Sequence, residues 1–181
     1  MLEDEIEDFE FQLNSLIENY PQLLFKSLFM AVYSHFERYL IDLCNAVRES
    51  ESLSLKPKDL GDKGIRRSQA YLKKVAGLNF PANTKEWQVI KLVTEIRNKL
   101  VHNPEHDFRQ DEVDPKLLDY FWLDDPSWDD FDVQSEDFMF SLGSIKNLAN
   151  TFVRFSTDID KAWEENNNLR KKFQQGPKHK K

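Results

Sequence analysis

The chain of 181 residues is poor in the residues that mark several common protein classes. It has one cysteine and five glycines, and no apolar run is long enough to span a membrane. A single cysteine, Cys44, excludes an intrachain disulfide, and its helical neighbours Leu40 and Val47 predict a packing role. No glycine-rich phosphate loop, Cys-x-x-Cys pair or serine-nucleophile elbow occurs. The acidic start of the chain lacks the basic and apolar regions of a secretory signal. We therefore expect a cytoplasmic protein that does not enter a membrane.

The apolar residues that are present recur at three- and four-residue intervals, which predicts an all-α protein. Four long segments and one shorter segment show this spacing and are expected to be helices: residues 2–20, 22–49, 84–102 and 135–165, and residues 65–75. Pro21 separates the first two, and Asn83 or Thr84 can cap the helix that follows. The expected fold is a helical bundle of four main helices plus short helices over residues 1–165. A basic, disordered tail over residues 166–181 follows.

Two apolar stripes define the faces that we expect to be buried. The stripe of residues 2–20 consists of Ile6, Phe9, Leu13, Leu16 and Ile17. The stripe of residues 22–49 consists of Leu24, Leu28, Val32, Phe36, Leu40, Leu43 and Val47. The aromatic content of the second segment indicates deep burial or an interface, which favours a homodimer.

The charge of the chain is unevenly distributed. The formal net charge of −7 argues against a protein that coats nucleic acid through bulk electrostatics. Residues 56–74 nevertheless hold seven basic residues and two acids, and residues 166–181 hold six basic residues and no acid. Such patches can bind RNA at a restricted site. The predicted RNA-binding residues are Arg66, Arg67, Lys73 and Lys74 of the first patch, together with Lys99 of the segment 84–102. A solvated helix face and a solubilising tail are the alternative interpretation.

The segment from Arg97 to Asn103 sets an arginine, a carboxamide and an imidazole at the end of an apolar helical pattern. An arginine offers a charged planar fork for phosphate oxygens, and an imidazole exchanges protons near neutral pH. Asn98 and His102 are four residues apart and share a helix face, whereas Arg97 lies about 140° from His102 on an ideal helix. Pro104 disfavours helical geometry in the preceding residue, so we expect the helix to end near His102.

These residues carry a resemblance to a known family. The segment from Glu95 to Asn103 resembles the Arg-x4-6-His motif of the HEPN superfamily in its Arg-Asn-x-x-x-His form. The segment Phe36-Glu37-Arg38-Tyr39-Leu40 is similar to the Phe-Glu-x-x-Leu helix found upstream in many HEPN families. The resemblance implies a helical bundle that dimerises so that two arginine–histidine pairs face each other and form a metal-independent endoribonuclease site. Many such proteins are toxins or act in defence against phage, while some relatives are non-catalytic binding or assembly modules.

The candidate catalytic residues are Arg97, His102, Asn98 and Glu37. His102 can transfer a proton and Arg97 can stabilise a charged transition state, while Asn98 can orient either group or hold the phosphate. A buried Glu37 carboxylate could fix the arginine fork. The alternatives are structural. His102 can cap helix carbonyls, Arg97 can pair with a surface acid at position 95 or 107, and Glu37 can pair with a nearby cation or face solvent.

Two segments have patterns similar to those of metal sites. The segment from His102 to His106 matches the His-x-x-Glu-His pattern of inverzincin metalloproteases, but Pro104 interrupts the continuous helix that this zinc site needs. The acidic residues 124–137 lack the glycine of a calcium-binding loop, so a solvated linker is expected there. We predict no metal and no cofactor.

The leading functional hypothesis is a metal-independent endoribonuclease of HEPN type that cleaves RNA by 2′-OH attack, acting as a toxin or antiviral effector. The expected partners are an RNA substrate, a second copy of the chain and a cognate antitoxin protein. The alternative is a non-catalytic HEPN-like module for dimerisation or protein interaction. The intact Arg97/His102 pair favours the first hypothesis, and the overall acidity leaves room for the second.

Overall fold

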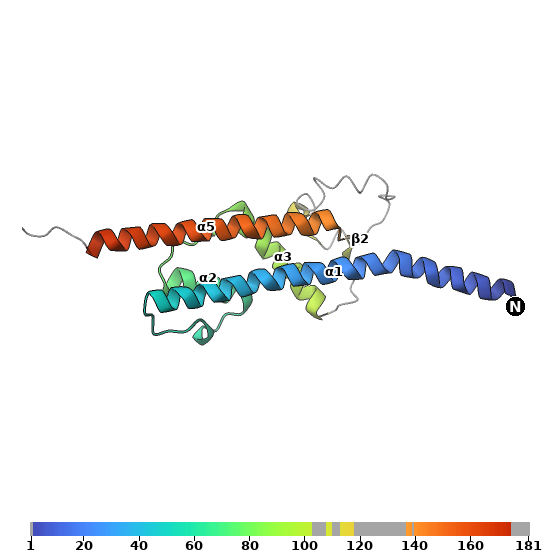
Figure 1. Cartoon of the computed structure of the whole chain (residues 1–181), viewed down its shortest axis with the longest axis horizontal. Helices are drawn as coiled ribbons and strands as arrows, with labels where there is room; N and C mark the ends of the chain where they lie inside the picture. Colours follow the sequence, from blue (N-terminus) through green and yellow to red (C-terminus); the bar gives the residue numbers. More distant parts are fainter. Residues whose placement is uncertain (1, 103–107, 110–112, 118–136, 139, 175–181) are drawn as a thin grey trace, which may run out of the picture. The chain divides into compact units, whose positions relative to one another are not determined.

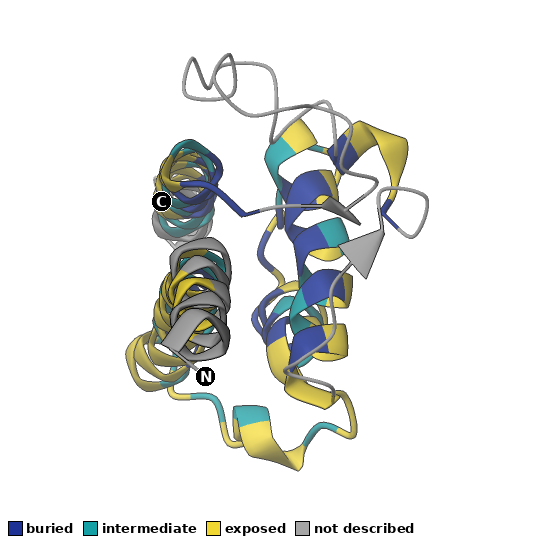
Figure 2. Ribbon diagram, turned by 90° about the vertical axis from the view of Figure 1, so that its right-hand side faces the viewer, coloured by how far each residue is buried: buried dark blue, intermediate teal, exposed yellow. Residues whose placement is uncertain are grey.

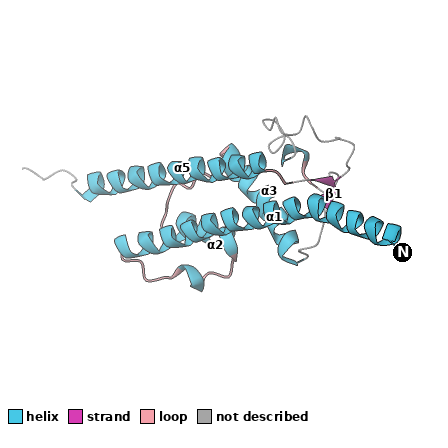
Figure 3. Ribbon diagram, turned by 45° about the vertical axis from the view of Figure 1, so that its right-hand side comes forward, coloured by secondary structure: helices cyan, strands magenta, loops and turns pink. Residues whose placement is uncertain are grey.

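The computed structural model describes residues 2–102, 108–109, 113–117, 137–138 and 140–174. The described chain is mostly helical, which confirms the predicted all-α class. The helices, in chain order, are α1 (Leu2–Ser50), a short 3-10 turn η1 (Pro57–Asp59), α2 (Gly64–Ala70), the π-helical turn η2 (Tyr71–Val75), α3 (Lys85–His102) and α5 (Leu142–Gln174), all drawn in Figure 1. Two strands of two residues each, β1 (Phe108–Arg109) and β2 (Asp137–Phe138), pair antiparallel with Phe108 opposite Phe138. β1 is labelled in Figure 3.

The first two predicted helices are a single helix. α1 runs without interruption through Pro21 (Figure 1), so the predicted break at this residue is wrong. A proline inside a helix removes one backbone hydrogen bond but does not forbid helix on both sides when other contacts hold the turn. Such contacts are present at Gln22. Its side-chain amide donates to the Phe140 carbonyl at 3.0 Å and accepts from the Phe140 N–H at 3.0 Å.

The buried face of α1 also differs from the prediction. Phe36, Leu40 and Val47 are buried as expected, but Phe9, Leu13, Leu24 and Leu28 are exposed. Leu43 and Val32 are half-buried, and Ile6, Leu16 and Ile17 belong to residues whose side chains are not described. The buried positions of the middle of the helix are instead Phe29 and Tyr33. The predicted burial of Phe9, Leu13, Leu24 and Leu28 is therefore wrong.

The chain divides into two compact units. The first consists of Met1–Tyr33 and Leu92–Ala149, and the second of Ser34–Lys91 and Asn150–Lys181. Inside the first unit, the Phe29 and Phe140 rings lie 5.0 Å apart between centroids. Inside the second, Phe36 stacks on Phe152 at 4.2 Å. Each unit therefore has aromatic packing of its own.

The predicted helix over residues 65–75 is confirmed in outline. α2 begins at Gly64 and continues into the π-helical turn η2. Gly64 has φ +55°, and an added Cβ would lie 3.0 Å from a Glu37 carboxylate oxygen, so this position needs glycine on both counts. The segment ends before Gly77, which adopts φ +67° and so has the left-handed conformation typical of a helix end.

α3 forms as the sequence predicts. The Thr84 hydroxyl accepts a hydrogen bond from the Trp87 backbone N–H at 3.2 Å, which confirms the predicted cap. The helix ends at His102, as expected from the following proline. Buried and exposed positions alternate along its ribbon (Figure 2), the pattern of an amphipathic helix.

The last helix differs from its predicted bounds of 135–165 at both ends. α5 begins at Leu142, where Ser141 and Ser144 form reciprocal caps: each hydroxyl accepts a 3.0 Å bond from the backbone N–H of the other residue. It continues to Gln174, so part of the predicted disordered tail is helical. The run from Leu169 to Gln174 holds residues with good helix propensity, which explains the extension despite sparse apolar content.

Cys44 is fully buried, as predicted, and its thiol lies 3.7 Å from the Ser68 carbonyl oxygen. Burial raises the pKa of this thiol to about 11. The cysteine is therefore a packing residue. Among the helices that the structure describes, none is long and apolar enough to cross a membrane. The acidic stretch 124–136 and most of the His102–His106 segment lie outside the described residues.

Candidate functional site

The Arg97 side chain is held by two neighbours in the first unit. Its guanidinium carbon lies 5.5 Å from the centroid of the Tyr33 ring, within range of a cation–π interaction. One guanidinium nitrogen, Nη1, donates a 3.1 Å hydrogen bond to Oδ1 of Asn98. Arg97 is half-buried and its Nε is covered by protein atoms. The arginine is therefore not a freely rotating surface side chain.

The tyrosine beneath the guanidinium is itself fixed. Tyr33 is 1% exposed, and its hydroxyl donates to the Thr94 hydroxyl at 3.0 Å. Thr94 lies three residues before Arg97 on the same helix, so one turn of α3 supplies both the cation and an anchor for the ring beneath it. A buried, hydrogen-bonded ring is a rigid platform. This arrangement limits the directions in which the guanidinium fork can point.

His102 is the last residue of α3 and is exposed. Asn98 is also exposed and, four residues earlier, lies on the same face of the helix. An exposed imidazole at a helix end is accessible to a large substrate such as RNA. The structure thus brings Arg97 and Asn98 into contact and leaves His102 at the open end of the same helix.

Glu37 belongs to the second unit, whereas Arg97 belongs to the first. Within its own unit the Glu37 carboxylate lies against Gly64, at the start of α2. Arg38, one of the nearby cations, donates from Nε to Asp42 at 3.0 Å. The role of Glu37 in orienting Arg97 stays a prediction.

The predicted RNA-binding residues of the second unit lie on α2 and η2. Arg66, Lys73 and Lys74 are exposed. Arg67 is half-buried, and its Nε donates to the Asp62 carbonyl. Arg66 and Arg67 belong to α2, and Lys73 and Lys74 belong to η2. Lys99 is exposed on α3 in the first unit.

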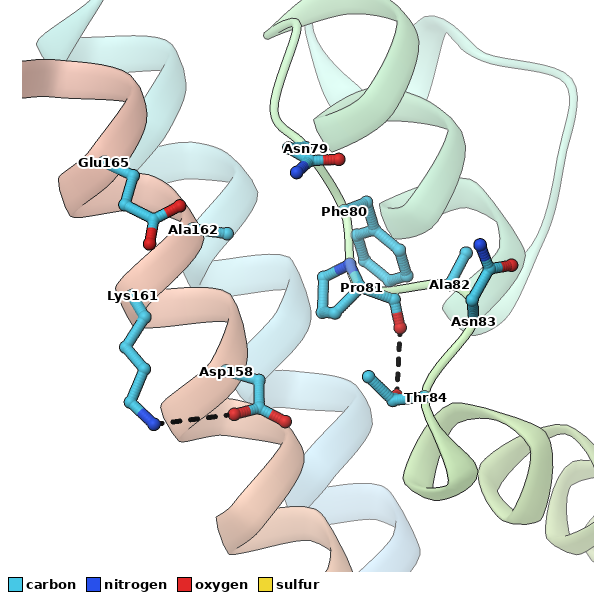
Figure 4. A pocket seen from close by; sticks show the side chains of 10 residues that line it. All are labelled: Asn79, Phe80, Pro81, Ala82, Asn83, Thr84, Asp158, Lys161, Ala162 and Glu165. Carbon is cyan, nitrogen blue, oxygen red and sulfur yellow. Dashed lines mark hydrogen bonds and ion pairs between the residues drawn. The ribbon is translucent and has the colours of Figure 1, made fainter. Parts of the chain in front are cut away.

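A separate polar pocket lies in the second unit, between residues 79–84 and α5 (Figure 4). Its volume is about 400 Å³. Asp158, Lys161 and Glu165 line it on the helix side, and Lys161 pairs with Asp158 at 3.7 Å. On the other side, Thr84 donates to the Pro81 carbonyl at 3.0 Å. None of the predicted catalytic or RNA-binding residues lines this pocket.

No group of three or more histidine, cysteine, aspartate and glutamate side chains within the described ranges is arranged to hold a metal ion. His106 and the acids of residues 124–136 lie outside those ranges. The absence of a zinc site at residues 102–106 and of a calcium site at residues 124–137 therefore stays a prediction.

Sequence reasoning missed Tyr33 and Thr94. Tyr33 is 64 positions from Arg97 in the sequence, and an aromatic ring on an apolar helix face is typical of a core residue. Thr94 lies on the motif helix at a spacing that could have indicated contact with Arg97. The signal that would have found the tyrosine is the three- and four-residue spacing of Phe29, Tyr33, Phe36 and Leu40, which defines the true buried face of α1.

No known protein-family model matches this chain, no curated protein is significantly similar to it in sequence, and no solved structure is significantly similar to it in fold.

Proposed function

We propose that the protein is a metal-independent endoribonuclease of HEPN type, with Arg97, Asn98 and His102 in its catalytic site. The observation that carries this proposal is the setting of Arg97. Its guanidinium is stacked on a buried tyrosine and bonded to Asn98, one turn from an exposed histidine. A fixed cation and an accessible imidazole are the two groups that phosphodiester cleavage requires of a protein that uses no metal.

The reaction is an intramolecular transesterification. His102 accepts the proton of the ribose 2′-OH, the 2′ oxygen attacks the adjacent phosphorus, and the bond from phosphorus to the 5′ oxygen breaks. The products are a 2′,3′-cyclic phosphate and a 5′-OH. Arg97 stabilises the negative charge on the phosphoryl oxygens of the transition state. Proton transfer by a positioned imidazole contributes typically about 10²- to 10⁴-fold to the rate.

The protonation of the leaving oxygen requires an acid as well as a base. One copy of the motif supplies one imidazole, so a homodimer that brings two motifs together provides both groups. The exposed cations Arg66, Lys73 and Lys74 would hold the RNA backbone by contacts to phosphate. Toxin or antiviral activity, with a cognate antitoxin as partner, follows from the HEPN resemblance alone.

The test is cleavage of a fluorescent single-stranded RNA in excess EDTA, with analysis of the ends. We expect 2′,3′-cyclic phosphate and 5′-OH ends, and a loss of at least roughly 100-fold in rate for Arg97→Ala and for His102→Ala. The matched controls are Arg154→Ala and His35→Ala, which remove an exposed arginine from α5 and an exposed histidine from α1. Both controls should cleave like the unmodified protein. Dependence on a divalent ion, or full activity of the two site variants, would reject the mechanism in favour of a non-catalytic interaction module.

A further inference from the structure

The N-terminal half of α1 displays large apolar side chains to solvent. Phe9 is 66% exposed, Tyr20 64% and Leu23 60%. Among the side chains of this half that the structure describes, the large exposed apolar ones are Phe9, Leu13, Tyr20, Leu23, Leu24 and Leu28, named here the outer stripe. Single exposed apolar residues are common, but six along one helix mark an interaction surface.

The outer stripe is one face of the helix. At 100° per residue, Phe9, Leu13, Tyr20, Leu23 and Leu24 fall within an arc of about 100°, with Leu28 at its edge. The buried residues Phe29 and Tyr33 project from the opposite side. α1 therefore has two apolar faces, and only one of them packs inside the described chain. From Phe9 to Leu28 the outer stripe is about 29 Å long.

We propose that the outer stripe is the interface with a second copy of this chain, in which the two α1 helices pack antiparallel. The spacing of the stripe is self-complementary in that arrangement. When the helices cross near residues 18 and 19, Leu13 lies opposite Leu24 of the other copy and Phe9 lies opposite Leu28. Two-fold symmetry repeats both pairs, as an isologous interface requires.

The charges of the helix favour the antiparallel orientation. Residues 2–28 contain seven acids and one base, Lys26, and six of the acids lie in residues 3–10. A parallel pair would set these six acids against the same six of the second copy, at a cost in repulsion. In the antiparallel register, residues 3–8 lie opposite residues 29–34, which carry no charged side chain. Glu10 then lies within one position of Lys26.

The apolar area is sufficient for a stable dimer. Six side chains that each expose on the order of 100 Å² give about 600 Å² per copy, or about 1,200 Å² for the pair, the lower bound for specific interfaces. This interface goes beyond the proposed function: Tyr33, over which Arg97 lies, projects from the opposite face of α1, so the contact does not itself join two copies of the motif. Its test measures association rather than cleavage.

The first experiment is analytical ultracentrifugation of the full chain and of the double variant Leu13→Glu/Leu24→Glu. We expect the unmodified protein to be a dimer at micromolar concentration and the double variant to dissociate with a Kd raised at least roughly 100-fold. The control is Val153→Glu, which adds one glutamate at a residue of α5 that is 65% exposed. This control should remain a dimer. A monomeric unmodified protein, or a double variant that still dimerises, would overturn the proposal.

Disulfide trapping tests the orientation without adding charge. Leu13→Cys and Leu24→Cys are made as separate proteins and are oxidised alone and as a mixture. Cys44 is buried, with a pKa of about 11, and does not compete at neutral pH. Antiparallel packing predicts efficient cross-linking only in the mixture. Cross-linking of each variant with itself would show a parallel pair, and no cross-linking beyond that of a Val153→Cys control would exclude the interface.

The two proposals can fail independently. If the outer stripe variants dissociate but the unmodified dimer cleaves no RNA, the interface stands and the nuclease mechanism falls. If RNA is cleaved in EDTA while Leu13→Glu/Leu24→Glu remains dimeric, the nuclease mechanism stands and this interface is rejected.

Discussion

The two halves of α1 have similar apolar periodicity but opposite environments. In residues 36–47, Phe36, Leu40 and Val47 are almost completely buried. In residues 9–28, the apolar side chains of the outer stripe are between 37% and 66% exposed. The difference lies in what each half contacts. Phe36 stacks on Phe152 of α5 at 4.2 Å, and its ring lies 6.1 Å from that of Phe155.

The comparison shows that the presence of an apolar helix face and the burial of that face are separate properties. Regular apolar spacing predicts a helix and the existence of an apolar face, because both depend on local sequence. Whether the face is buried depends on another segment or another molecule, which the local sequence does not specify. In the N-terminal half, the same pattern thus indicates an interface rather than a core.

The largest difference in stability between the two halves is expected when one aromatic residue of each is replaced by alanine. Phe36→Ala should lower the free energy of unfolding by about 3–5 kcal/mol, because it removes a packed ring and leaves a cavity. Phe9→Ala should change the stability of the isolated monomer by less than about 0.5 kcal/mol. Urea denaturation at a concentration where the protein is monomeric measures both. Equal losses for the two variants would show that the N-terminal half is packed in the monomer.

A second prediction concerns the proline between the halves. Pro21 is exposed within α1 and cannot donate a hydrogen bond to the preceding turn. Pro21→Ala should restore this bond and raise the free energy of unfolding by roughly 1–3 kcal/mol. Ser27→Ala, at another exposed position of α1, replaces a side chain whose hydroxyl donates to the Leu23 carbonyl at 2.8 Å, and should change stability by at most about 0.5 kcal/mol. A loss of stability in Pro21→Ala would mean that a bend at this residue is needed for packing.

The sequence predicts the features of this chain that local chemistry controls. The bounds of α3 follow from Thr84 and Pro104, and the burial of Cys44 follows from its helical neighbours. The continuation of α1 through Pro21 was not predictable in this way, because the next residue, Gln22, binds the backbone of Phe140, 118 residues away, and such a distant contact leaves no local signal. The stacking of Arg97 on Tyr33 was unpredictable for the same reason, because the two residues are distant in the sequence.

The same distinction between local sequence and distant contacts applies to the candidate site. Arg97, Asn98 and His102 were identified from one short segment, and their places on α3 agree with their spacing. The Ser141 and Ser144 caps show that a helix start can be missed when the capping box uses serine at its last position in place of Glu or Gln. Glu37 was predicted by resemblance, and its distance from Arg97 in sequence gave no local test of that role.

A third prediction compares tyrosines from the two halves. Tyr33→Phe keeps the ring under Arg97 but removes the hydroxyl bonded to Thr94, and should lower stability by about 1 kcal/mol. Tyr20→Phe removes an exposed hydroxyl and should change stability by less than about 0.3 kcal/mol. Urea denaturation of both variants measures the difference. If Arg97 acts on RNA, Tyr33→Leu should lower kcat, because the guanidinium loses the aromatic ring beneath it. Tyr33→Phe keeps this ring and should retain most of the rate.

The smallest expected effect is a change in pH dependence at Tyr39, in the buried half. Burial, followed by the neighbouring Asp160 carboxylate, raises the pKa of Tyr39 to about 12. Between pH 10 and 12 the phenol therefore ionises in the unfolded chain but stays protonated in the folded one. The unfolded state then binds fewer protons, so stability falls as pH rises through this window. For a half-buried group the loss should be about 1 kcal/mol after solvent screening. Urea denaturation at pH 8 and 11 should show a smaller alkaline loss for Tyr39→Phe than for the unmodified protein, while Tyr20→Phe follows the unmodified protein. Identical alkaline losses in all three proteins would contradict the assignment to Tyr39.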